Sequence, residues 1–149
     1  MTDLNLPPYE HIVRKENGRL MIFDILRRKY VALTPEEWVR QHFVHLLTDH
    51  KGYPPALLAN EVELRIGEKR LRCDTVLYNN LLQPRMIIEY KAPTVAITQR
   101  VLEQIMSYNI QMHVDYLIMS NGLVHYCLQY DQKSKKYLFL EDIPEYDNI

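Results

Sequence analysis

The residues best suited to chemistry are two acids and a lysine, Asp74, Glu89 and Lys91, on two neighbouring strand-like segments. Asp74 stands inside the run 71–78, and the other two close the short apolar run 86–91. Side chains two positions apart on a strand point to the same face, so Glu89 and Lys91 should share one face. Because sequential strands usually pair, the carboxylate of Asp74 can approach that of Glu89. The pattern predicts an acidic pair beside an ammonium group.

Carboxylates within about 4–6 Å of each other repel, and burial adds to that cost unless a cation compensates it. Oxygen ligands from Asp74, Glu89 and the backbone carbonyl of Tyr90, completed by waters, suit a hard ion such as Mg²⁺ or Mn²⁺. The sequence has no Cys and His spacing typical of zinc. Such an ion activates water and neutralises charge on a phosphate, while Lys91 can orient or help deprotonate that water. We therefore predict metal-dependent hydrolysis of a phosphodiester.

A helix ahead of these strands is expected to supply a further acid. Thr34 can cap it, a proline suits its first turn and Glu37 closes a capping box, so the helix should span residues 35–50. At 100° per residue, Glu36 falls within the apolar stripe of this helix and Glu37 points away from it. This favours Glu36 as the acid directed to the core, with Glu37 as the alternative. Arg40, an (i, i+4) partner, would instead make Glu36 part of a surface ion pair.

The remaining pattern predicts an α/β domain around these residues. A hairpin of strands at 62–66 and 71–78 precedes the strand at 86–91, and a helix should run from Thr98 to about Met112. Further strands are expected at 116–119, 124–128 and 137–140. The order αβββαβ predicts a mixed central sheet flanked by helices. We divide the single domain, residues 1–149, into a lead-in segment with one short strand (1–33), the core (34–130) and a C-terminal strand and tail (131–149).

Composition excludes several classes of protein. The 149 residues, 47% of them hydrophobic, can build one core, and 18 Lys and Arg against 19 Asp and Glu give no global attraction for polyanions. Cys73 and Cys127 stand in apolar stretches and are interpreted as reduced, structural thiols. The chain begins without a basic, apolar leader and holds no run of 18 apolar residues, so we expect a cytoplasmic protein. The absence of a Walker or GxGxxG motif argues against nucleotide-driven chemistry.

The run from Asp74 to Glu89-Tyr90-Lys91, after a helical glutamate and within αβββαβ, resembles the PD-(D/E)XK nuclease superfamily. That resemblance implies that the aspartate and glutamate bind metal and that the lysine is catalytic. Gln104 and Tyr108 match the Gln-x-x-x-Tyr element of RecB-like members, which implies support of Lys91 or contact with the substrate phosphate. More narrowly, residues 34–41, 53–54, 89–93 and 121–122 together resemble the N-terminal nuclease domain of type I restriction enzyme R subunits.

This narrower resemblance covers roughly residues 9–130 and implies DNA as substrate, with other restriction-modification subunits as partners. Cys73 stands where the superfamily name expects proline. R subunits carry an ATP-driven translocase after this domain, and because this sequence ends at Ile149 we do not carry ATP-dependent restriction over to it.

Simpler readings compete with each of these assignments. Glu89 and Lys91 can form a plain ion pair at a solvated strand end, and Tyr108 can be a core tyrosine with Gln104 on a helix edge. The basic clusters at 27–29, 69–72 and 133–136 are either solvated faces or contacts for a phosphate backbone. The near-neutral charge favours the rival function, a non-cleaving DNA-binding or assembly module that docks to other restriction subunits. Oligomeric state and sequence preference are left open.

Overall fold

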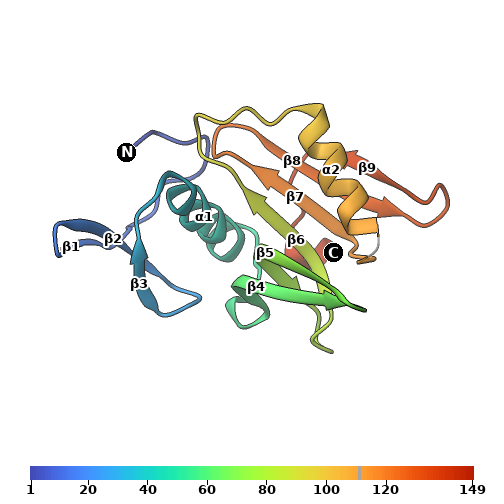
Figure 1. Ribbon diagram of the computed structural model, residues 1–149, viewed down its shortest axis with the longest axis horizontal. Helices are drawn as coiled ribbons and strands as arrows, with labels where there is room; N and C mark the ends of the chain where they lie inside the picture. The colour runs from blue at the N-terminus through green and yellow to red at the C-terminus, as the bar shows by residue number, and fades with distance from the viewer. Residues whose placement is uncertain (111) are drawn as a thin grey trace.

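The computed structural model describes residues 1–110 and 112–149, with all of their side chains except those of Ile66 and Tyr108. The described residues form two α-helices and nine strands, arranged in a six-stranded and a three-stranded sheet. Figure 1 shows the larger sheet crossing the molecule beside helices α1 and α2, with the smaller sheet on the far side of α1. Neither helix offers the apolar length that a bilayer crossing requires.

The larger sheet has the strand order β4-β5-β6-β7-β8-β9. Neighbouring strands are antiparallel except β6 and β7, which are parallel because the chain crosses between them through α2. The strands are β4 (Leu58–Ile66), β5 (Lys69–Tyr78), β6 (Pro84–Tyr90), β7 (Tyr116–Ser120), β8 (His125–Asp131) and β9 (Lys136–Leu140). This mixed sheet with its helices confirms the predicted α/β class and the order αβββαβ.

Helix α1 (Pro35–His45) packs on one face of this sheet and continues as a π-helical turn over Leu46–His50, so the predicted extent of 35–50 is correct. Thr34 caps the helix as predicted, because its hydroxyl accepts the backbone N–H of Glu37 at 3.1 Å. The capping box is wrong, because the N–H of Thr34 donates to the carbonyl of Ala32 and the Glu37 carboxylate binds Arg40. Apolar side chains of the helix meet those of the strands in a shared core that contains Val39, Phe43, Leu47, Leu77, Ile88 and Tyr90. Burial of each large side chain contributes about 1.5–3 kcal/mol, which holds the helix against the central strands.

Helix α2 (Gln99–Ile110) begins after Thr98, whose hydroxyl accepts the N–H of Val101 at 3.3 Å. It covers the opposite face of the sheet, where Ile105 packs against a second hydrophobic cluster that contains Cys73, Val76, Ile87, Leu117 and Leu128. The residues of β6 alternate between the two clusters, as the pleat of a strand requires. Both cysteines are buried and free, and burial raises the pKa of each thiol to about 12, which makes them unreactive packing residues.

The lead-in segment is more ordered than the one short strand expected at residues 20–24. It forms a three-stranded antiparallel sheet of β1 (Val13–Glu16), β2 (Arg19–Asp24) and β3 (Lys29–Ala32). The first hairpin turns at Asn17 and Gly18, both with positive φ (49° and 78°), which is the Asn-Gly signal of a two-residue turn. Asp24 anchors this sheet to the larger one, because its carboxylate accepts hydrogen bonds from Arg27 and from Asn60 of β4.

Candidate active site

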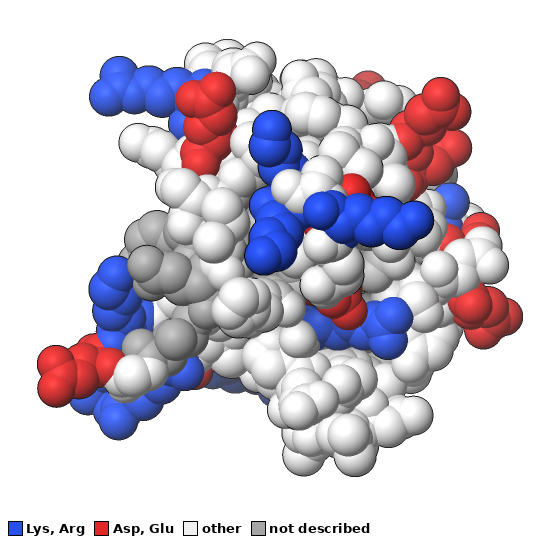
Figure 2. All heavy atoms as spheres, turned by 90° about the vertical axis from the view of Figure 1, so that its right-hand side faces the viewer, with Lys and Arg blue, Asp and Glu red and all other residues white. Residues whose placement is uncertain are grey.

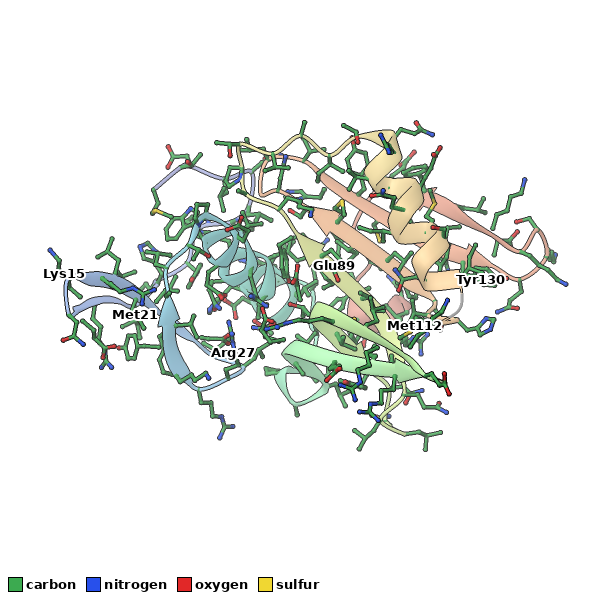
Figure 3. All side chains as sticks on the ribbon, viewed as in Figure 1. Lys15, Met21, Arg27, Glu89, Met112 and Tyr130 are labelled. Carbon is green, nitrogen blue, oxygen red and sulfur yellow. The ribbon has the colours of Figure 1, made fainter. Side chains whose placement is uncertain are left out.

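The two predicted acidic ligands come together where β5 and β6 separate. The last ladder pair between these strands joins Thr75 and Ile88, and Asp74 and Glu89 are the next residue on each strand. The backbone N–H of Tyr90 donates to Asp74 Oδ2 at 2.9 Å, and a hydrogen bond links the two carboxyl groups. The side chains of Asp74 and Glu89 therefore share one face of the sheet, and Figure 3 shows Glu89 near the centre of the molecule on β6.

The electrostatics of this pair are those of two carboxyl groups in contact. Burial, the negative charge of Asp74 and the hydrogen bond between the carboxyls raise the pKa of Glu89 to about 9, while the ammonium of Lys91 acts in the opposite direction. The raised pKa of Glu89 favours a single shared proton on the pair at neutral pH. A cation that displaced the proton would meet two adjacent carboxylates.

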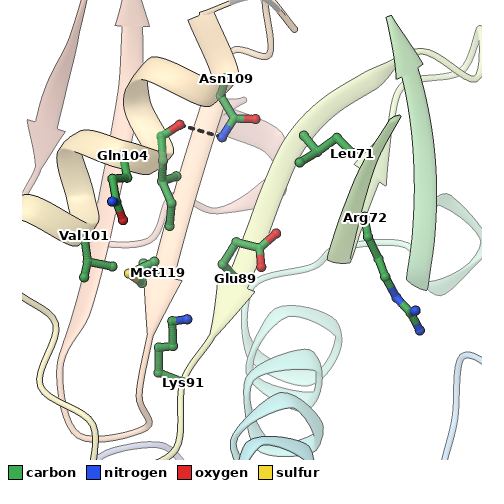
Figure 4. Close-up of a pocket in the computed structure, with 9 residues that line it drawn as sticks. Leu71, Arg72, Glu89, Lys91, Val101, Gln104, Asn109 and Met119 are labelled. Carbon is green, nitrogen blue, oxygen red and sulfur yellow. Dashed lines mark hydrogen bonds between the residues drawn. The ribbon is translucent and has the colours of Figure 1, made fainter. Parts of the chain in front are cut away.

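Lys91 and Gln104 face the same cavity as Glu89. The cavity has a volume of about 220 Å³ and is lined by Leu71, Arg72, Glu89, Lys91, Val101, Gln104, Ile105, Asn109 and Met119. Lys91 follows β6 directly, and its side chain is exposed. Its backbone N–H donates to the carbonyl of Ser120 at 2.9 Å, which holds the backbone of Lys91 against β7. Figure 4 shows the Lys91 amine directed into the space between Met119 and Glu89, with Gln104 on the wall formed by α2.

Two tyrosines were also assigned to the site. Tyr90 directs its N–H toward Asp74, and because the N–H and carbonyl of a strand residue project to the same side, its carbonyl lies on that side too. Its buried ring points to the other face of the sheet, where its hydroxyl donates to Thr75 Oγ1 at 2.9 Å. The backbone of Tyr108 lies in α2, but its side chain is outside the described residues, so its role stays a prediction.

The predicted orientation of the helical acid is wrong: Glu36 is exposed and Glu37 is buried. The helix does not bury a single stripe, because every residue from Glu37 to Val44 is buried. Both acids lie in the first turn, and Glu37 is held in the interior by ion pairs with Arg27 and Arg40. Arg40 pairs with Glu37 (Nε to Oε2, 2.9 Å), so the alternative surface pair with Glu36 does not form either.

Sequence reasoning missed the part that Arg40 plays beside the acidic pair. Its Nη1 donates to the backbone carbonyl of Asp74 at 2.8 Å, and its Nη2 donates to Glu61 Oε1 at 2.6 Å. Glu61 lies opposite Asp74 on β4, has a positive φ of 56° and binds Arg72 through its other oxygen at 2.8 Å. Negative neighbours raise the pKa of Arg40 despite its burial, so it stays charged. The spacing of Glu37, Arg40 and Gln41 on one helix face was the available signal.

The basic clusters have different surroundings. Arg27 is largely buried and forms ion pairs with Glu37 at 2.8 Å and with Asp24. Arg72 lies at the cavity, whereas Lys133, Lys135 and Lys136 are exposed around the turn between β8 and β9. Figure 2 shows Lys and Arg side chains gathered in the middle of one face, with most Asp and Glu side chains nearer its margin. Positive charge is therefore local, as the net charge of −1 requires.

The mixed sheet, the helix on each of its faces and the acidic pair at the end of β6 define a class: an α/β domain with a restriction-endonuclease-like fold. Comparison with protein families specifies it further. The model of the family "Type I restriction enzyme R protein N terminus (HSDR_N)" matches residues 35–144, and the chain belongs to this family. No curated protein matches the sequence.

Two solved structures match parts of the chain. A fragment of a chain assigned as an HsdR subunit of a type I restriction enzyme from Vibrio vulnificus YJ016 matches with a TM-score of 0.52 and 17% identity, over 77% of this chain and 24% of that one. The cryo-EM structure of a DrdV–DNA complex matches with a TM-score of 0.44 and 20% identity, over 73% of this chain and 11% of that one. The chain thus spans about a quarter or less of the length of either relative, and the first likeness supports the fold.

Proposed function

We propose that this domain is a Mg²⁺- or Mn²⁺-dependent nuclease that hydrolyses phosphodiester bonds of DNA. The observation that carries the proposal is the hydrogen-bonded pair of Asp74 and Glu89, with Lys91 following on the same strand and facing the same cavity. Membership of a restriction enzyme R protein family supports the substrate, and the resemblance to PD-(D/E)XK nucleases supports the roles of these residues.

The residues present fit a hard divalent ion. Among the described residues, no group of three or more His, Cys, Asp and Glu side chains is arranged to hold a metal, so protein ligands would be two carboxylates and the Tyr90 carbonyl, with waters completing the shell. Mg²⁺ commonly binds through one or two carboxylates and keeps several waters. The proximity of Asp74, which raises the pKa of Glu89, places two carboxyl groups where such an ion would bind both. When bound, it would lower the pKa of a water and neutralise charge on the phosphate.

The other residues act on the phosphate and the attacking water. The Lys91 ammonium, on a backbone fixed to β7, orients the water and offsets the negative charge that builds on the phosphate oxygens. The Gln104 amide, on the wall formed by α2, donates to a phosphate oxygen, and Tyr108 on the same helix is assigned the same supporting role. Glu36 keeps its proposed catalytic role only if its exposed carboxylate meets the substrate, because it is not directed to the core.

Metal binding and cleavage test the proposal separately. Calorimetric titration of Mn²⁺ into the purified domain should give one site per chain, lost in Asp74→Asn and in Glu89→Gln. Single- and double-stranded DNA should be cut with Mg²⁺ or Mn²⁺ and left intact in EDTA. Lys91→Ala should lower the rate by at least about a hundredfold without unfolding the protein.

The matched control for Lys91→Ala is Lys15→Ala, which removes an exposed ammonium from the small sheet, far from the cavity (Figure 3). It should cut DNA at the wild-type rate. Equal rates for the two variants, or Mn²⁺ binding that survives both acid substitutions, would rule out the assigned site.

One observation favours a second candidate function, a non-cleaving module that binds DNA or docks to other restriction subunits. The net charge of −1 and the mixed charges on the face in Figure 2 give weak attraction for a polyanion. If this function is correct, the wild-type domain retains duplex DNA or a partner subunit in a binding assay but leaves DNA intact with every divalent ion tested.

A further inference from the structure

The inner wall of the cavity carries a buried acceptor that the proposed hydrolysis does not use. Asn109 of α2 is 3% exposed, and its Nδ2 donates to the carbonyl of Ile105 at 2.8 Å. Because a carbonyl oxygen only accepts, the amide nitrogen must face Ile105, which fixes the orientation of the side chain. Asn109 Oδ1 then has no hydrogen-bond partner within the described part of the chain. Figure 4 shows this oxygen turned away from the helix, toward Leu71 across the cavity.

The cavity combines charged and apolar groups. Glu89, Lys91 and Arg72 contribute the charges, and the apolar surface comes from Leu71, Val101, Ile105 and Met119. Leu71 and Ile105 lie on the side of Asn109, whereas Val101 and Met119 lie on the side of Lys91 (Figure 4). A ligand that fits this arrangement has a charged group at the acidic pair and a flat, mostly apolar body that ends in a hydrogen-bond donor. A nucleotide has this form, with its phosphate at one end and the N–H groups of its base at the other.

The size of the cavity selects a single base and excludes a stacked duplex. Its volume of about 220 Å³ is below the roughly 300–1,000 Å³ of pockets for drug-sized ligands. Proteins that turn a base out of the stack hold it between apolar surfaces and read its edge by hydrogen bonds. On the edge that faces the major groove, cytosine and adenine present an amino group, whereas thymine and guanine present a carbonyl oxygen that an acceptor would repel.

We propose that this cavity binds the base next to the scissile phosphate, turned out of the stack, and that Asn109 Oδ1 accepts a hydrogen bond from the amino group of cytosine or adenine. The proposal rests on the proposed nuclease function for the position of the phosphate. It makes Asn109 a specificity-determining residue on the helix that also carries Gln104.

Mononucleotides test the base site without any cleavage. In the presence of Ca²⁺, the wild-type domain should bind deoxycytidine 5′-monophosphate roughly fivefold more tightly than thymidine 5′-monophosphate, as one neutral hydrogen bond allows. Nuclear magnetic resonance should show the shift at the side-chain amide of Asn109. Asn109→Leu should bring the two affinities within a factor of about two, and Ser107→Ala, on an exposed position of the same helix, should keep the wild-type ratio.

A second variant covers the case in which Asn109→Leu does not fold. Val101→Phe fills the cavity from a partly exposed position and leaves the amide in place, so both mononucleotides should bind at least about tenfold more weakly. Equal affinity of the wild type for both nucleotides, an unchanged ratio in folded Asn109→Leu, or unchanged binding by Val101→Phe would overturn the base site.

Cleavage mapping separates this proposal from the proposed function. On oligonucleotides, wild-type cuts should concentrate beside cytosine or adenine, and Asn109→Leu should lose this preference. If the wild type cuts no DNA but discriminates the mononucleotides, the nuclease function fails and the base site stands. If it cuts DNA without base preference and binds both mononucleotides equally, the nuclease function stands and the base site fails.

Discussion

Replacing Glu89 with glutamine should stabilise the metal-free protein, although it removes a predicted metal ligand. Burial and the neighbouring Asp74 raise the pKa of Glu89 from its ordinary 4.5 to about 9 in the folded protein. Between these values the folded chain binds one more proton than the unfolded chain, so stability falls as pH rises. Glutamine carries no such proton and can donate its amide N–H to Asp74, so the variant should not show this loss.

The size of this stability loss follows from the difference between the pH of the measurement and the ordinary pKa of 4.5. At pH 7 the wild type would lose at most about 3 kcal/mol relative to pH 4, at about 1.4 kcal/mol for each unit. Relaxation of the pair reduces this, so we expect Glu89→Gln to be about 1–3 kcal/mol more stable than the wild type in EDTA. For a chain of this length the Tm should rise by roughly 3–10 °C.

Thermal unfolding in EDTA between pH 5 and pH 8, repeated with Mn²⁺, measures both effects. The wild type should lose stability toward pH 8 and regain about 2.7 kcal/mol when Mn²⁺ is near one hundred times its Kd, whereas Glu89→Gln should show neither change. Glu68→Gln, at an exposed position in the turn between β4 and β5, is the control and should follow the wild type. The reasoning is refuted if Glu89→Gln in EDTA is less stable than the wild type at pH 8, or if its Tm still rises with Mn²⁺.

Three further substitutions test the supporting structure, each by urea denaturation against the wild type. Gly122→Ala should cost about 1–2 kcal/mol, because Gly122 has a φ of 85° and a Cβ there would lie 2.6 Å from Leu4 Cδ2; an unchanged midpoint would contradict this. Arg40→Lys should cost on the order of 3 kcal/mol and weaken Mn²⁺ binding, since lysine cannot replace the bidentate pairing or the bond to the Asp74 carbonyl; wild-type Mn²⁺ affinity would refute the positioning role. Thr34→Ala should cost about 1 kcal/mol through loss of the helix cap, whereas Thr34→Ser should restore most of it.

A buried network of ion pairs, formed by Arg40, Glu37 and Glu61, lies beside the acidic pair. The carboxylates of Glu37 and Glu61 balance the positive charge of Arg40, which also donates a hydrogen bond to the backbone carbonyl of Asp74. It therefore positions β5 without neutralising the acidic pair. The negative charge of Asp74 and Glu89 therefore remains available to bind a metal ion or a proton.

Periodicity and caps in the sequence determined the elements that carry the site. The two helices, the succession of strands along the chain and the helix cap at Thr34 depend on contacts within a few residues, so local patterns were sufficient. The approach of Asp74 to Glu89 was also predictable, because alternation along a strand and pairing of sequential strands together fix which side chains share a face.

Tertiary structure alone decided which groups surround that pair. Glu37 rather than Glu36 is buried because it pairs with the guanidinium groups of Arg40 and of Arg27, which comes from the lead-in segment. The partner of Arg40 on β4 and the unsatisfied oxygen of Asn109 also arise where distant segments meet. The pattern of residues along one segment encodes the side of the helix or strand from which a side chain projects. It does not encode which charged group or cavity a distant segment places next to that side chain.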